Sequence, residues 1–140
     1  MASARETADR LTQAIERGDV DGAAACYGAE AVVVAPEGTF RGREQIEEYW
    51  RAFLEAFSDL QVSISARFDA GDSAMDEWSF SATHSGPLET PGGTVAPTGR
   101  RVTLRGADAG VVRDGVIAEH RIYYDQAALL EQLGTTPAHA

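Results

Sequence analysis

Residues 43–68 read REQIEEYWRAFLEAFSDLQVSISARF, and the spacing of the apolar residues changes within this stretch. From Arg43 to Phe57 the large apolar residues recur every three or four positions, which is the spacing of one face of a helix. From Leu60 to Phe68 apolar and polar residues alternate, which is typical of a strand with one buried face. A long amphipathic helix followed at once by a half-buried strand predicts that helix and sheet cover each other. The apolar stripe of this helix comprises Ile46, Tyr49, Trp50, Phe53 and Phe57.

The residues before this stretch predict two further helices and a strand. Ser3 to Glu6 fits a capping box, and the helical spacing that follows predicts a first helix over residues 4–17. Asp19 can cap a short second helix. Ala31 to Val34 has the β-branched character of a buried strand, which the Pro-Glu-Gly that comes soon after is expected to end. The short second helix is expected to carry Ala23, Ala24 and Tyr27.

The residues after residue 68 predict an antiparallel meander. Met75 to His84 alternates again and is expected to pair with the strand before it. Arg101 to Arg113 and Val116 to Tyr124 are expected to form two more strands, joined at Asp114-Gly115, a dipeptide that suits a tight hairpin turn. Asp125 fits a helix cap better than a catalyst, and it opens a last helix that ends at Gly134 before a loose tail over residues 135–140. Helices in the first half and strands in the second indicate an α+β domain.

One connection, Ser85 to Gly99, is unusually rich in turn-forming residues. It holds three of the five prolines of the chain and four glycines. A long irregular connection inside a compact domain is often a lid or binding loop, and a simple hairpin tip is the alternative.

Composition narrows the function classes. A chain of 140 residues with 44% hydrophobic and 24% charged residues fits one globular domain over residues 1–140. Its net charge of −10 opposes binding to nucleic acid and to anionic membranes. No stretch approaches the roughly 18 apolar residues that span a bilayer, and we expect a cytoplasmic protein. Cys26 is the only cysteine, so no internal disulfide is expected, and its alanine neighbours predict a buried helical thiol.

Several short segments resemble a known family. Residues 18–22 (GDVDG) and 40–46 (FRGREQI) are similar to helix junctions of the NTF2-like superfamily. Residues 82–86 (ATHSG), 96–102 (APTGRRV) and 114–120 (DGVIAEH) are similar to its SnoaL-like polyketide cyclase branch. Together with the order of the expected elements, the resemblance covers about residues 4–134.

The resemblance implies a cone of three N-terminal helices packed on a curved mixed or antiparallel sheet, with a short C-terminal helix. It further implies a pocket for a hydrophobic, oxygenated ring compound, no cofactor, no metal, and a homodimer built on the outer face of the sheet.

The catalytic positions of the family's best-known enzymes differ here. In the cyclases the Glu-His pair of the last strand is followed by Trp and then by the catalytic Asp, whereas Glu119-His120 is followed by Arg121 and Ile122. The positions of the ketosteroid isomerase base and helix tyrosine are occupied by Ala35 and Leu11. Any chemistry must therefore use other residues.

Three polar side chains on apolar strand faces are the remaining catalytic candidates. His84 shares strand parity with Trp78 and Phe80, and an imidazole can act as acid or base near neutral pH; the alternative is a histidine bonded to loop backbone. His120 shares parity with Ile122 and Tyr124, unless a bulge moves it or its face is the dimer face.

Asp108 is the third candidate. It shares parity with Leu104 and Val112, and burial would raise the pKa of such a carboxyl and make it the best general base. Gly106 and Gly110 suggest, as the alternative, a bulge that turns it to solvent. Side chains expected to bind substrate or to fill the core are Tyr27, Trp50, Phe53, Trp78, Phe80, Ile122 and Tyr124.

The sequence supports two hypotheses. The first is a cofactor-independent SnoaL-like enzyme, a cyclase or isomerase that cyclises, isomerises or hydrates a polyketide-like or terpenoid-like molecule through His84, His120 and Asp108. The second is a non-catalytic protein of the same fold that binds a small hydrophobic molecule, and the missing family carboxylates favour it.

Overall fold

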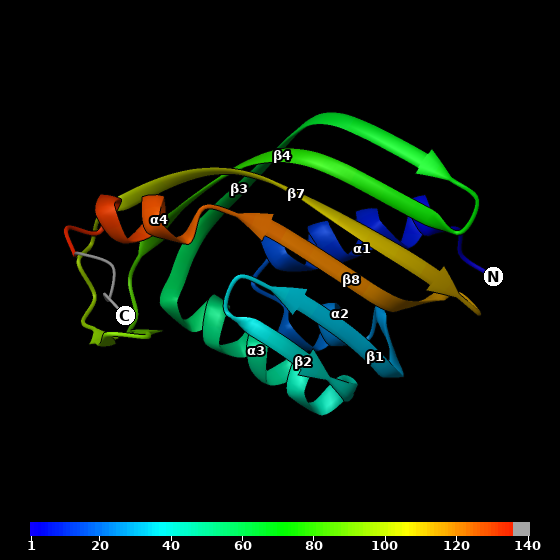
Figure 1. Cartoon of the computed structure of the whole chain (residues 1–140), viewed down its shortest axis with the longest axis horizontal. Coiled ribbons are helices and arrows are strands. Elements are labelled where there is room, and N and C mark those ends of the chain that lie inside the picture. Colours follow the sequence, from blue (N-terminus) through cyan, green and yellow to red (C-terminus); the bar gives the residue numbers. More distant parts are fainter. Residues whose placement is uncertain (136–140) are drawn as a thin grey trace.

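Four helices and two sheets make up residues 1–135, the part of the chain that the computed structural model describes (Figure 1). The helices are α1 (Ala4–Glu16), α2 (Val20–Ala24), α3 (Gly42–Ala56) and α4 (Gln126–Gln132). The strands are β1 (Tyr27–Ala35), β2 (Gly38–Arg41), β3 (Phe57–Ala70), β4 (Ser73–His84), β5 (Leu88–Thr90), β6 (Gly93–Val95), β7 (Arg101–Arg113) and β8 (Val116–Tyr124). The expected tail over residues 136–140 lies outside the described residues.

Six of the strands form one sheet in the order β2-β1-β8-β7-β4-β3. Every neighbouring pair is antiparallel except β1 and β8, which run parallel, so the sheet is mixed. The long strands β3, β4 and β7 curve over α1 and α3, and the sheet does not close on itself (Figure 1). This α+β arrangement of helices under a curved mixed sheet confirms the expected NTF2-like fold class.

The helices α1, α2 and α4 begin at caps that the sequence predicts. Ser3 accepts a hydrogen bond from the Glu6 amide at 3.1 Å and Glu6 accepts one from the Ser3 amide at 3.0 Å, which completes the capping box of α1. Asp19 accepts from the Gly22 amide and opens α2, and Asp125 accepts from the Ala128 amide and opens α4. Asp125 is therefore a helix cap, as predicted.

The apolar stripe of α3 packs against the concave face of the sheet. Ile46 of α3 is completely buried and Trp50 of α3 is 6% exposed, whereas Phe57, expected in the helix, is buried as the first residue of β3. At the far end of the same face, the buried Asp76 of β4 is held by Arg5 of α1 at 2.7 Å. This ion pair fastens the start of α1 to the sheet.

The expectations for Tyr27 and Cys26 are corrected, and three short strands appear that the sequence analysis did not predict, β2, β5 and β6. Tyr27 opens β1 rather than lying in the second helix, because β1 pairs with the distant β8. The chain turns at Pro36-Glu37 into β2, which the sequence did not suggest. Residues 85–99 contain the short β5–β6 hairpin. Cys26 is buried but follows α2, and burial raises the pKa of its thiol.

The β7–β8 connection occurs as predicted, but the pairing of the two strands differs at one place. Asp114 and Gly115 both have positive φ, as a two-residue hairpin turn of this kind requires. A register shift between Val111 and Val112 places Ile117 in the core in place of its neighbours Val116 and Ala118. Among residues 1–135, no helix is long and apolar enough to cross a membrane.

Candidate functional site

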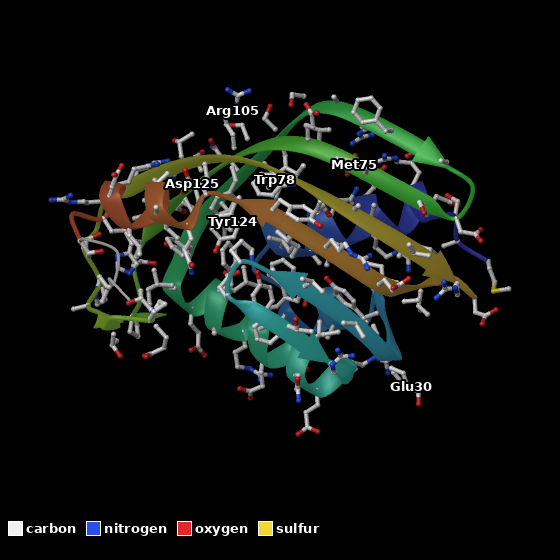
Figure 2. The ribbon with its side chains drawn as sticks, viewed as in Figure 1. Glu30, Met75, Trp78, Arg105, Tyr124 and Asp125 are labelled. Atoms are coloured by element: carbon white, nitrogen blue, oxygen red, sulfur yellow. The ribbon has the colours of Figure 1, made fainter. Side chains whose placement is uncertain are left out.

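A cavity lies between the concave face of the sheet and the helices α1 and α3. The space between them measures about 900 Å³ when its opening to solvent is counted. Figure 2 shows Trp78 and Tyr124 on the inner side of the curved sheet and Arg105 projecting from the outer side. The lining is mainly apolar and aromatic, and it includes Trp50, Phe53, Trp78, Phe80, Asp108, His120, Ile122 and Tyr124.

A chain of hydrogen bonds runs along the wall of this cavity. Trp50 Nε1 lies 3.1 Å from the Tyr27 hydroxyl, which lies 2.8 Å from His120 Nδ1. His120 Nε2 lies 2.7 Å from Asp108 Oδ2, and Trp78 Nε1 lies 3.0 Å from Asp108 Oδ1. Five side chains from β1, β4, β7, β8 and α3 thus form one polar network, called here the Asp108 network.

One arrangement of protons satisfies the whole Asp108 network. The two indole N–H groups can only donate, and an ionised Asp108 can only accept. With a neutral His120 that carries its proton on Nε2, Trp50 donates to Tyr27, Tyr27 to His120, and His120 and Trp78 to Asp108. The reverse direction would leave the Tyr27 hydroxyl proton without an acceptor in the network. We therefore assign the Nε2–H tautomer to His120.

One glycine of β7 makes room for this network. Gly106 faces Trp78 on one neighbouring strand and Tyr124 on the other, and a Cβ at Gly106 would clash with the Trp78 indole. Gly110 faces His120 across the β7–β8 ladder, but a Cβ at Gly110 would meet only the Glu119 carbonyl oxygen, at 3.9 Å. Gly106, which suggested a bulge in the sequence, instead provides space for the Trp78 ring.

Asp108 faces the cavity. The β4–β7 pairing runs without a shift from Ser73 opposite Val111 to Thr83 opposite Arg101, so no bulge turns Asp108 outward. Its side chain is 24% exposed, whereas that of His120 is 4% exposed. Asp108 is therefore the member of the pair that a ligand can touch, and His120 orients it.

Tyr27 lies behind His120 and is completely buried. Burial is the main cause that raises the pKa of its hydroxyl, and the charge of Asp108 adds to it. The phenol therefore stays protonated at neutral pH and remains a donor to His120. It supports the site without lining the cavity.

His84 lies outside the lining of this cavity, which corrects its expected place beside Trp78 and Phe80. It does share their strand face, but it sits at the end of β4 against Phe57 and is fully buried. Its Nδ1 accepts from the Thr98 amide at 3.2 Å and lies 3.0 Å from the Thr98 hydroxyl. Burial lowers the pKa of this imidazole. The contacts are those of a histidine that anchors the segment 85–99.

The comparisons with known proteins agree with this architecture. The SnoaL-like domain family matches residues 8–120. The chain belongs to the SnoaL-like domain family. No curated protein matches its sequence.

Several solved structures resemble this SnoaL-like protein over nearly its whole length. IdmH of Streptomyces antibioticus, a candidate polyketide cyclase, is 28% identical with a TM-score of 0.77 and coverage of 96% of this chain and 100% of its own. AclR of Streptomyces galilaeus, a candidate hydroxylase, is 25% identical with a TM-score of 0.80, and the match covers 96% of this chain and 97% of AclR.

A candidate SnoaL-like polyketide cyclase of a Jannaschia species is 17% identical with a TM-score of 0.79 and coverage of 98% and 97%, which shows the fold alone. Family membership supports an enzymatic or ligand-binding role for this chain.

A second polar group in the cavity was missed by the sequence reasoning. Glu37, in the turn between β1 and β2, lines the cavity together with Tyr49 and Tyr124. The Tyr124 hydroxyl donates to Glu37 Oε2 at 2.6 Å, and the Tyr49 hydroxyl lies 3.5 Å from the same oxygen. No signal marked Glu37, because a charged residue between Pro36 and Gly38 is ordinary for a solvated turn.

The remaining lining residues of this SnoaL-like site are apolar or uncharged. Ile122, at the position of the cyclase carboxylate, lines the cavity directly opposite Asp108 on β8. Leu88 of β5 closes part of the wall from the segment 85–99. Within residues 1–135 no three His, Cys, Asp or Glu side chains are grouped so as to hold a metal ion. The lining is completed by residues that the sequence did not predict to bind substrate, namely Leu11, Thr12, Ile15, Phe57, Val62, Leu104 and Leu129.

Proposed function

We propose that this SnoaL-like protein is a cofactor-independent enzyme that moves a proton within a hydrophobic ketone of polyketide or terpenoid type, leading to isomerisation or cyclisation. The observation that carries the proposal is the Asp108 network: one carboxylate borders an apolar cavity and is held by two donors. The candidate cyclase activity of IdmH, 28% identical, supports the same substrate class.

Asp108 is the proposed general base. It takes a proton from the carbon next to a substrate carbonyl, and the C–H electron pair becomes the enolate π bond while negative charge moves to the carbonyl oxygen. The enolate carbon then attacks a second carbonyl of the same molecule, whose π electron pair becomes an alkoxide that takes the proton back from Asp108; for isomerisation, the proton returns from Asp108 to another carbon. His120 and Trp78 hold the carboxylate in place, and Tyr27 fixes the tautomer of His120.

Exchange of hydrogen for deuterium tests the base directly. The ketone 2-tetralone has acidic hydrogens beside its carbonyl, and their exchange in D2O can be followed by NMR. We expect the protein to accelerate this exchange and Asp108→Asn to lower the acceleration by about a hundredfold or more, which is the range of general acid/base groups. Asp114→Asn, a change in the hairpin turn that tolerates asparagine, is the matched control.

The second candidate function is binding without catalysis. Ile122 in place of the cyclase carboxylate favours it, because it leaves the cavity with one carboxylate fewer than those enzymes. A protein that binds 2-tetralone and never accelerates its exchange beyond buffer would contradict the enzyme and support this alternative.

A further inference from the structure

Glu37 and its two tyrosines form a second polar end of the cavity. The three side chains come from separate elements: Glu37 from the β1–β2 turn, Tyr49 from α3 and Tyr124 from the end of β8. Both phenols are directed at the same carboxylate oxygen, Oε2. No other hydrogen bond to the Glu37 carboxylate occurs within residues 1–135, and Glu37 is exposed, so Oε1 is open to water or to a ligand at the mouth of the cavity.

The two polar ends lie on one wall and are well separated. His120, Ile122 and Tyr124 follow one another on the inner face of β8, and the first and last are four residues apart. At about 3.3 Å per residue, their Cα atoms are about 13 Å apart. Ile122 lies between them, and Phe53 and Phe80 line the same cavity. Asp108 itself lies opposite Ile122, two residues or about 7 Å along the strand from Tyr124, so a ligand that touches both carboxylates must carry two separate polar groups on an apolar body.

The chemistry of the Glu37 end is selective. A carboxylate only accepts hydrogen bonds, and a phenol that already donates to it can offer only its lone pairs. Burial and the charge of Glu37 raise the pKa of both Tyr49 and Tyr124, so the phenols keep their protons at neutral pH. All three groups therefore present acceptors to the cavity. A ligand hydroxyl or ammonium group is favoured there, whereas an ether, a carbonyl or a carboxylate is not.

We propose that Glu37 is a specificity-determining residue that binds a hydroxyl or amine at the end of the ligand remote from Asp108. The ligand is then a rigid ring compound with a carbonyl at the inner end and a hydrogen-bond donor at the outer end. The assignment of the inner end rests on the proposed function, whereas the recognition by Glu37 does not.

A pair of probes that differ in one group tests this selectivity. The compounds are 6-hydroxy-2-acetylnaphthalene and 6-methoxy-2-acetylnaphthalene, which share rings and carbonyl but differ in the donor. The chain has two tryptophans, Trp50 and Trp78, and both line the cavity, so quenching of their fluorescence reports binding there. We expect the wild-type protein to bind the hydroxy probe about tenfold more tightly, since hydrogen bonds to charged groups are among the stronger ones.

Variants separate the possible causes. Glu37→Gln is expected to lower the affinity for the hydroxy probe about tenfold and to change the affinity for the methoxy probe by less than about twofold. Glu30→Gln, on the exposed side of β1 away from the cavity (Figure 2), is the matched control and should keep the preference. Asp108→Asn should also keep the preference for the hydroxy probe, although it loses the acceleration of hydrogen exchange in 2-tetralone. The two measurements therefore test the proposed base and the role of Glu37 separately.

Three results would overturn the inference. They are equal affinity of the wild-type protein for both probes, a tenfold preference that survives in Glu37→Gln, and no quenching by either probe. Circular dichroism and thermal unfolding of Glu37→Gln establish that the variant is folded before its affinities are compared.

Discussion

Removal of one oxygen atom at Tyr27 tests whether the Asp108 network holds the site together. Tyr27→Phe keeps the ring and its packing but leaves Trp50 Nε1 without an acceptor and His120 Nδ1 without a donor. All three side chains are buried, so water cannot readily replace the hydroxyl. A buried polar group left without a partner costs about 1–3 kcal/mol, and two such groups predict a loss of about 3 kcal/mol in the free energy of unfolding.

Chemical denaturation and heat measure this loss. For a chain of this size, about 3 kcal/mol corresponds to a fall of about 10 °C in the melting temperature. Tyr123→Phe is the matched control, because its side chain is 57% exposed on the other face of β8, and it should change stability by less than about 0.5 kcal/mol. A double variant with Trp50→Phe should lose less than the sum of the single variants, since it removes one of the stranded groups.

The Nδ1 resonance of His120 provides a readout that a general loss of stability would not change. In the wild-type protein Asp108 accepts the proton on Nε2, and Nδ1 accepts a hydrogen bond from Tyr27. In Tyr27→Phe we expect Nδ1 to lose this hydrogen bond, which shifts its resonance in nitrogen NMR spectra, and slower deuterium exchange of 2-tetralone. The reasoning is refuted if Tyr27→Phe unfolds within about 0.5 kcal/mol of the wild type and leaves the Nδ1 resonance unchanged.

Four further outcomes are expected. Arg5→Ala removes the main partner of the buried Asp76 carboxylate and should lower the free energy of unfolding by about 3 kcal/mol in urea titrations at neutral pH. Burial lowers the pKa of His84 in the folded protein, so the free energy of unfolding should fall as the pH drops below the unfolded pKa of about 6.5. In His84→Gln the midpoint of urea unfolding should depend less on pH between about 7.5 and 5.5. Amide exchange over residues 85–99 should be faster than in β4 and β7 and should slow when 2-tetralone is present, whereas equal protection without ligand would argue against a lid. Light scattering at micromolar concentration should give about twice the mass of one chain, as expected of a homodimer built on the outer face of the sheet.

The parts of the fold that depend on residues close together in the sequence were predictable. The change of apolar spacing after Phe57 marks the passage from α3 to β3, and the Asp114-Gly115 turn marks the β7–β8 hairpin; both occur as predicted. The start of β1 at Tyr27 and the existence of β2 were missed. Pairing of β1 with β8 joins residues about 90 positions apart, and spacing within a short window carries no information on such contacts.

The candidate site was predictable in its residue types and less so in its geometry. Strand parity placed Asp108 and His120 on inner faces, but which residues meet depends on the register of β7 against β8. Gly106 and Gly110 gave the wrong signal, because a glycine opposite a ring looks the same in sequence as a glycine in a bulge. His84 shared the right face, yet it lies at the end of β4, where its ring packs against Phe57 and does not line the cavity.

The register of β7 against β8 also bears on the absence of the cyclase carboxylate at position 122. Asp108 and Ile122 are direct partners across the two strands, where Cβ atoms are only about 5 Å apart. Two ionised carboxylates at that separation in an apolar cavity would repel each other, and one would be forced to keep its proton. An aspartate at 108 and an aspartate at 122 are therefore competing ways to place a single charge in the same volume. With Ile122 opposite it, Asp108 has no second carboxylate as its direct cross-strand neighbour.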